Sequence, residues 1–170
     1  MAEADVDLGV LSDHLAATRL GSAKYVTDLA LAQADGYQVI TPMMPDMGVH
    51  YLNPAITDFD PGRPPILVYV PTPGGPQLGA LEWVLPEESA EPPLPGATYG
   101  EFPAACHFVD GTFEPRNGEA NCAPTSSETG AAFAFWHGRL ITMHVWLWFH
   151  NLDGLFAGMN PLVDPFNAEA

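Results

Sequence analysis

The chain has 170 residues and a formal net charge of −16 at pH 7, because 21 aspartates and glutamates outnumber five lysines and arginines. Proteins that bind a phosphate backbone or an anionic membrane surface carry clustered basic residues, and here the five are scattered. The composition therefore argues against nucleic acid and membrane as partners. A hydrophobic content of 47% is typical of a folded protein, and no stretch approaches the roughly 20 apolar residues that cross a bilayer.

The length suits one domain, residues 1–170, and the 18 prolines and 16 glycines predict many turns between short elements. The first predicted element is a helix over residues 12–34. Ser12 is placed to cap its start and Gly36 to end it, whereas Gly21 weakens the middle and could split it. Its apolar positions follow a period of about 3.6 residues, namely Leu11, Leu15, Leu20, Val26, Leu29 and Ala30.

After Tyr37 the hydrophobic pattern alternates, which is typical of strands. A hairpin loop over 72–77 joins two of these strands, and Gly138 is placed for a tight type II′ hairpin turn between the last two. The segment 86–130 is rich in chain breakers and is predicted to be an irregular excursion or a lid. Strands are predicted over residues 38–41, 49–52, 66–70, 78–85, 132–137 and 140–149.

These elements predict an α+β fold that is mostly antiparallel β. Strands that follow one another through hairpins pair antiparallel, and an amphipathic helix covers one face or one end of such a sheet. We therefore expect the N-terminal helix to pack on a curved sheet, either a barrel or a sandwich.

Glu82 is a charged residue type in a sequence context that predicts burial. It lies in a predicted strand whose two faces are otherwise apolar. A carboxylate there must be desolvated at a cost of several kcal/mol, keep its proton, or meet a cation. The alternatives are an edge strand that leaves Glu82 in solvent, or an ordinary buried hydrogen bond.

Two histidines occupy similar positions. Alternation divides residues 140–150 into a wholly apolar face and a second face that mixes aromatic and polar side chains, His144 among them. Such a mixture is typical of a ligand cavity wall. His50 points away from its neighbours Val49 and Tyr51, so it can face the same cavity. Each histidine could also be an ordinary hydrogen-bonded core residue.

His50, Glu82 and His144 together form the ligand set of a two-histidine, one-carboxylate metal site, which leaves coordination positions open. The predicted cofactor is one divalent ion, and iron, zinc, copper and manganese all suit these ligands. Glu82 and Tyr51 are the predicted catalytic residues. Trp83, Trp146 and Trp148 are the predicted ligand-binding residues, shaping an apolar pocket.

The leading hypothesis is a metal-dependent enzyme acting on a small, partly apolar or aromatic substrate. Iron would suit oxygen-dependent oxidation, and zinc or manganese would suit hydrolysis or lyase chemistry. The first alternative is a non-catalytic binding protein for a small apolar ligand, in which Glu82 stays protonated. The second is a structural or interaction protein with a solid core.

The remaining histidines and the cysteines carry weaker signals. If Gly138 turns a hairpin, His137 lies roughly 13 Å along the strand from His144 and cannot share its ion. His107 is interpreted as a surface residue, or as a fourth ligand from a lid. Cys106 and Cys122 are 16 residues apart; a disulfide would contribute about 3 kcal/mol, and two free thiols fit equally well.

Several segments carry a resemblance to a known family. They are His50-Tyr51-x-Asn53-Pro54, Glu82-Trp83-Val84-x-Pro86, and His144-Val145-Trp146-Leu147-Trp148 running into Gly154-Leu155-Phe156-Ala157 and Asn160-Pro161, with Ala23-Lys24-Tyr25 and Ala34-Asp35-Gly36-Tyr37 before them. Together they resemble a family of small, often exported bacterial proteins of uncharacterised function. The resemblance implies a common fold and an extracellular or cell-envelope location, and it implies no activity. Residues 1–7 lack the basic and apolar regions of a signal peptide, so we expect either a cytoplasmic protein or a trimmed leader.

Overall fold

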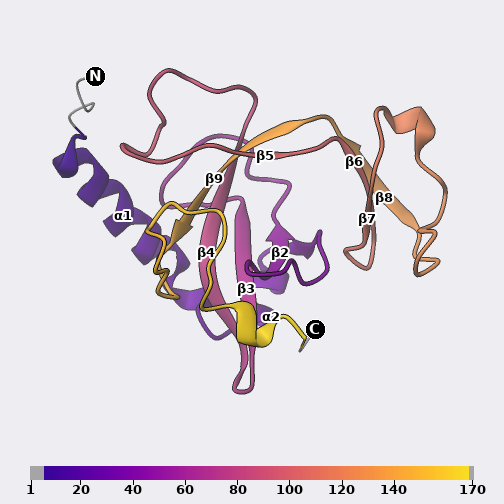
Figure 1. Ribbon diagram of the computed structural model, residues 1–170, viewed down its shortest axis with the longest axis horizontal. Helices are drawn as coiled ribbons and strands as arrows, with labels where there is room; N and C mark the ends of the chain where they lie inside the picture. The colour runs from indigo at the N-terminus through magenta and orange to yellow at the C-terminus, as the bar shows by residue number, and fades with distance from the viewer. Residues whose placement is uncertain (1–5, 169–170) are drawn as a thin grey trace.

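The computed structural model describes residues 6–168, which form two antiparallel sheets and a helical N-terminal segment (Figure 1). Residues 1–5, which include most of the acidic start, lie outside this range. The helices are α1 (Leu8–Ser22) and α2 (Leu29–Ala34), with 3-10 helices η1 (Ala23–Tyr25), η2 (Glu119–Asn121) and η3 (Asp164–Phe166). The strands are β1 (Gln38–Val39), β2 (Val49–Leu52), β3 (Ile66–Thr72), β4 (Gly75–Leu85), β5 (Gly100–Phe102), β6 (Ala105–Phe108), β7 (Phe113–Pro115), β8 (Phe133–His137) and β9 (Leu140–Trp146).

The main sheet has six strands in the order β1-β2-β3-β4-β9-β5, and the second sheet has three in the order β7-β6-β8. Every pairing within them is antiparallel. The predicted α+β class is therefore confirmed, while the barrel or sandwich stays a prediction. The predicted loop over 72–77 is a hairpin that turns at residues 73–74, because Thr72 already pairs with Gly75.

The helical segment begins earlier than predicted, and it breaks next to Gly21, where the sequence indicated that it could split, because α1 ends at Ser22. The Asp7 carboxylate accepts hydrogen bonds from the backbone N–H groups of Gly9 and Val10, so the predicted cap, Ser12, lies inside α1. Leu20, placed in the apolar stripe, is 82% exposed. Gly21 has a packing role, because a Cβ there would lie 1.9 Å from the Gly62 carbonyl oxygen. 

The end of the helical segment agrees with the prediction. Gly36 follows the C-terminus of α2 with a φ of 104°, a conformation that favours glycine. Its backbone N–H donates to the carbonyl of Gln33, which ends the helical turn.

The predicted hairpin at Gly138 is wrong. β8 pairs with β6 in the second sheet, whereas β9 pairs with β4 and β5 in the main sheet. Gly138 is not among the glycines with positive φ, so the chain does not reverse there. It runs on from one sheet to the other, as Figure 1 shows along the top of the molecule.

The segment 86–130 is only partly irregular, because it contains β5, β6 and β7. β5 pairs with β9, and β6 pairs with β8. The chain runs from β5 into β6 and from β8 into β9, so the two pairs form one continuous ribbon that passes from the main sheet into the second sheet. Cys106 in β6 forms a disulfide with Cys122, which resolves the open question about the thiols. The segment is therefore more regular than predicted, whereas the lid stays a prediction.

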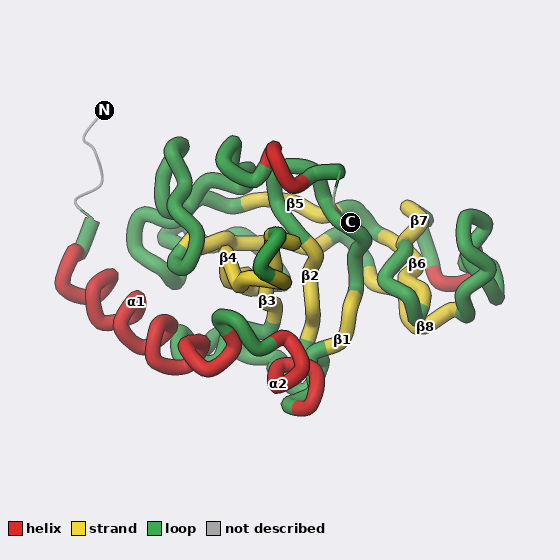
Figure 2. The backbone as a smooth tube through the Cα atoms, turned by 90° about the horizontal axis from the view of Figure 1, so that it is seen from below, coloured by secondary structure: helices red, strands yellow, loops and turns green. Residues whose placement is uncertain are grey.

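The two faces of the main sheet bury different side chains. α1 and α2 lie along one side of it (Figure 2), and there residues such as Leu81, Trp83 and Met143 form the larger core with Tyr25 and Ala32. Val68, Ala80 and Trp146 belong to a smaller core on the opposite face. That opposite face carries the candidate site. Among residues 6–168, no helix is both long and apolar enough to span a membrane.

Candidate metal centre

Three buried side chains from three strands meet on the face of the main sheet that is turned away from the helices. Glu82 in β4 lies directly opposite His144 in β9, and His50 comes from β2, on the far side of β3. One ligand atom from each residue lies within 4.8 Å of the other two. Each residue is at most 7% exposed. The predicted convergence of His50, Glu82 and His144 is confirmed.

The distances from Glu82 to each of the two histidines match those between ligands of one ion. Nε2 of His50 lies 3.5 Å from Oε2 of Glu82, and Nε2 of His144 lies 3.4 Å from Oε1. Two ligand atoms, each about 2.1 Å from a tetrahedral ion, are about 3.4 Å apart. A charge-assisted hydrogen bond would instead bring nitrogen and oxygen to about 2.8 Å. The spacing therefore fits a group held between the side chains better than direct contacts.

His144 carries the clearest sign that a partner belongs here. Its Nε2 atom is buried and has no hydrogen-bond partner among the described residues. A buried polar atom without a partner costs roughly 1–3 kcal/mol, and native structures rarely contain one. A metal ion bonded to this nitrogen would satisfy it. The residues present therefore fit a divalent ion.

His50 is oriented by Thr41, which sequence reasoning missed. The Thr41 hydroxyl oxygen accepts a hydrogen bond from the His50 backbone N–H at 3.0 Å and lies 3.1 Å from Nδ1 of the same residue. The ring is thereby held with Nε2 toward Glu82. Such support of the second ring nitrogen is common for metal-binding histidines. No spacing pattern marks a lone threonine for this role.

Burial also keeps His50 uncharged. Desolvation lowers the pKa of His50 to about 4, although the nearby Glu82 carboxylate acts to raise that pKa and His144 acts to lower it further. At neutral pH its imidazole is therefore neutral and has a free lone pair. Metal binding requires this state, because a protonated ring nitrogen cannot coordinate.

The three residues open onto a cavity of about 760 Å³, within the size range of small-molecule sites. Its walls come from both sheets and from the loops after β1 and β9. They are mostly apolar, and they include three methionines and three phenylalanines: Met44, Met47, Met159, Phe102, Phe113 and Phe135. The sequence predicted a cavity but not these residues, because most come from the second sheet and from loops.

Most predicted pocket residues lie elsewhere. Tyr51 packs edge-to-face against Tyr69 in the helix-side core, because alternation turns it away from His50. The ring of Trp83, although this residue borders the cavity, is buried in the same core, and its indole donates to the carbonyl of Asp60. 

Trp146 and Trp148 also pack in the two cores of the main sheet. β9 ends at Trp146, so Trp148 no longer follows its alternation; it packs on the helix side and donates to the Ser22 hydroxyl. Trp146 shares the face of His144, but it packs in the smaller core and donates to the carbonyl of Ala157. We therefore leave Tyr51, Trp146 and Trp148 out of the proposed site, whereas Trp83 borders its cavity.

His107 and His137 line the same cavity. His107 is 1% exposed, so the interpretation as a surface residue is wrong. Its Nε2 lies 2.9 Å from Nε2 of His137. Desolvation lowers the pKa of His107 to about 4 and also lowers the pKa of His137. Sequence reasoning missed this pair, because the supposed hairpin separated β8 from β6.

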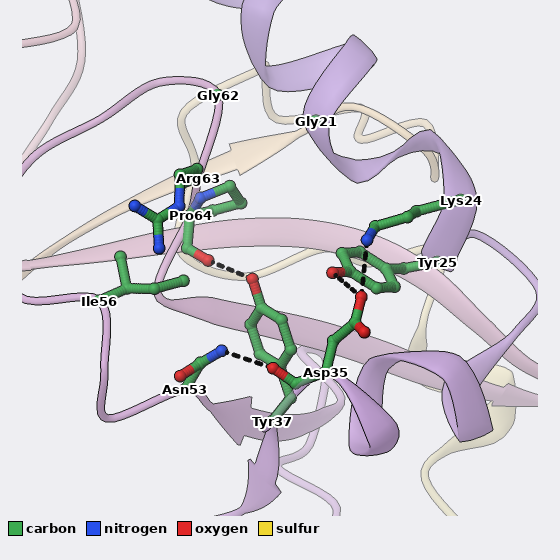
Figure 3. Close-up of a pocket in the computed structure, with 10 residues that line it drawn as sticks. All are labelled: Gly21, Lys24, Tyr25, Asp35, Tyr37, Asn53, Ile56, Gly62, Arg63 and Pro64. Carbon is green, nitrogen blue, oxygen red and sulfur yellow. Dashed lines mark hydrogen bonds and ion pairs between the residues drawn. The ribbon is translucent and has the colours of Figure 1, made fainter.

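A smaller cavity of about 290 Å³ lies between the helical segment and the loop before β3 (Figure 3). Most of its polar side chains bind within it: Asp35 accepts from Lys24 and from the Tyr25 hydroxyl, and Tyr37 donates to the carbonyl of Pro64. Asn53 donates to the Asp35 backbone carbonyl. This network ties the helices to the sheet and has a structural role.

Comparison with protein-family models, with curated proteins and with solved structures finds no match for this chain. The resemblance noted in the sequence therefore stays a prediction.

Proposed function

We propose that this protein is a metal-dependent enzyme in which His50, Glu82 and His144 hold one divalent ion at the wall of the cavity. The observation that carries the proposal is the buried, unpartnered Nε2 of His144, at ligand spacing from a carboxylate whose other oxygen faces a second imidazole. The two imidazoles would supply nitrogen ligands, and the Glu82 carboxyl group would supply an oxygen ligand. Iron, zinc, copper and manganese remain the candidates.

The protein's own residues would bind and orient the substrate. A divalent ion bound by three protein ligands supplies Lewis-acid or oxygen-activating chemistry at its open positions. The apolar walls favour a small, partly apolar or aromatic substrate. Glu82 would hold the ion from between the two imidazoles, and Thr41 fixes the ring of His50. The charge of −16 supports a small molecule rather than nucleic acid or a membrane surface as the partner.

Metal analysis of untagged protein tests the proposal. We expect His144→Ala to lower the metal content by one ion per chain, while His150→Ala, which changes an exposed histidine, leaves it unchanged. Far-ultraviolet circular dichroism should show that both variants are folded. Equal metal content in a folded His144→Ala variant and the wild type would reject the proposal.

The apolar cavity also favours a second candidate, a non-catalytic protein that retains a small apolar ligand. Removal of metal by a chelator separates the two. The metal site predicts a fall in melting temperature on chelation, which added ion restores. The ligand-binding alternative predicts no change on chelation and a co-purified apolar compound in the mass spectrum of extracted protein.

We also propose an extracellular or cell-envelope location. The Cys106–Cys122 disulfide supports it, since such bonds persist mainly in oxidising compartments. Thiol titration of protein released from its native compartment under alkylating conditions tests this. No alkylated cysteine is expected, and two alkylated cysteines per chain would refute the location.

A further inference from the structure

The cavity holds a second pair of imidazoles that the proposed centre does not use. His107 in β6 and His137 in β8 come from paired strands, with Ala105 opposite His137 and His107 opposite Phe135. The two histidines are therefore diagonal neighbours on one face of the second sheet. Their Nε2 atoms face each other at 2.9 Å.

The hydrogen bonds of the other ring nitrogens fix the protonation of this pair. Nδ1 of His107 lies 2.7 Å from the carbonyl oxygen of Ile40, and Nδ1 of His137 lies 2.6 Å from that of Gly138. A carbonyl oxygen only accepts, so each Nδ1 carries the ring hydrogen. In a neutral imidazole the remaining nitrogen is then an acceptor. In two neutral rings these lone pairs would face each other at 2.9 Å and repel. The gap is therefore bridged, either by a shared proton, which makes the contact a hydrogen bond, or by a metal ion that lies off the line between the two nitrogens.

A metal ion matches the geometry of the pair. Two nitrogens, each about 2.05 Å from an ion and at right angles to one another, are about 2.9 Å apart. A tetrahedral ion would require about 3.4 Å. Right-angled nitrogen ligands are typical of Cu²⁺ and Ni²⁺. Donation of Nδ1–H to a backbone carbonyl is the usual arrangement around metal-binding histidines.

The aromatic surroundings hold the rings in this arrangement. His107 stacks on Phe135 with ring centroids 4.8 Å apart and planes 5° apart, and it also stacks on Phe113 at 5.6 Å. Phe102 packs at 5.5 Å from His137. The phenyl rings offer no hydrogen-bond acceptor, so Nε2 of neither histidine has a competing polar partner among these neighbours.

We infer that His107 and His137 form a second metal site on the wall of the same cavity, which prefers an ion with right-angled nitrogen ligands. The remaining coordination positions would be taken by water or by a ligand in the cavity. The two sites share one anchoring segment, because the Ile40 carbonyl holds His107 and the adjacent Thr41 hydroxyl holds His50. The inference uses none of the residues of the first centre, so either site can fail without the other.

Titration of chelator-treated protein with Cu²⁺ tests the inference, with calorimetry to count the ions. We expect two ions per chain for wild type and one each for His137→Phe and His144→Gln. The double variant should bind none, and His150→Gln, at an exposed position, should still bind two. His137→Phe replaces a half-buried ring beside Phe102 with another aromatic ring, so the second sheet should keep its packing.

The electron paramagnetic resonance spectrum of His144→Gln with one Cu²⁺ gives an independent readout. Splitting from two equatorial nitrogens is expected, and it should be absent when His137→Phe is added. Unchanged Cu²⁺ stoichiometry in His137→Phe would overturn the inference. It would also be overturned by a far-downfield proton resonance from the pair that persists at saturating Cu²⁺, which would show that a shared proton occupies the gap.

Discussion

The burial of His50 makes the stability of the metal-free protein depend on pH in a defined direction. The pKa of His50 is about 4 in the folded protein against an ordinary value of 6.5. Between these values the unfolded chain binds a proton that the folded protein does not, so the free energy of unfolding falls as the pH falls. The difference of about 2.5 pH units, at 1.36 kcal/mol each, corresponds to a loss of about 3 kcal/mol between pH 6.5 and pH 4.

The comparison that isolates this effect is between wild type and His50→Asn, whose side-chain amide can replace Nδ1 opposite Thr41. Urea unfolding of both proteins, treated with chelator, would be followed from pH 7 to pH 4. His107 contributes in the same pH range to both proteins, so its share cancels in the difference. We expect the advantage of wild type over the variant to shrink by about 3 kcal/mol toward pH 4. A constant difference across this range would refute the reasoning, and His150→Gln should show the wild-type slope.

Three further outcomes are expected. Thr41→Val should weaken metal binding at the first centre by about 10- to 100-fold in a competition titration with a chelating dye, because the ring of His50 loses its support; unchanged affinity would count against the role of Thr41. Reduction of the Cys106–Cys122 disulfide, or its replacement by two serines, should lower the free energy of unfolding by about 3 kcal/mol in urea, and the absence of any shift would contradict this. Gly21→Ala should cost about 1–3 kcal/mol by overpacking against the Gly62 carbonyl, whereas Gly158→Ala, with nothing within 4 Å of the new Cβ, should be nearly neutral.

The central part of the site could be predicted because strand alternation is a local property. Glu82 lies in a strand that is apolar on both faces, and His144 lies on the polar face of a strand whose other face is wholly apolar. The alternation of a strand determines which face of the sheet each of these side chains occupies. In the structure both side chains occupy the predicted face. The spacing of residues along the sequence does not indicate that the strands of Glu82 and His144 are neighbours. Only the expectation that both side chains are buried suggested that they meet.

The rest of the site depends on where strands end and which partners they choose. Gly138 between two alternating segments is compatible with a reversal and with a straight crossing, and only the pairing of β8 with β6 decides between them. The proximity of His107 and His137 could not be predicted for this reason. Trp148 was misplaced because β9 ends two residues before it, and a side chain beyond a strand end no longer follows the alternation.

Diffraction from crystals of the metal-loaded protein, recorded at the absorption edge of the bound metal, tests the central claim most directly. An anomalous peak about 2.0–2.2 Å from Nε2 of His50, Nε2 of His144 and a carboxylate oxygen of Glu82 is the expected result. A fully loaded crystal with no peak between these three side chains would contradict it.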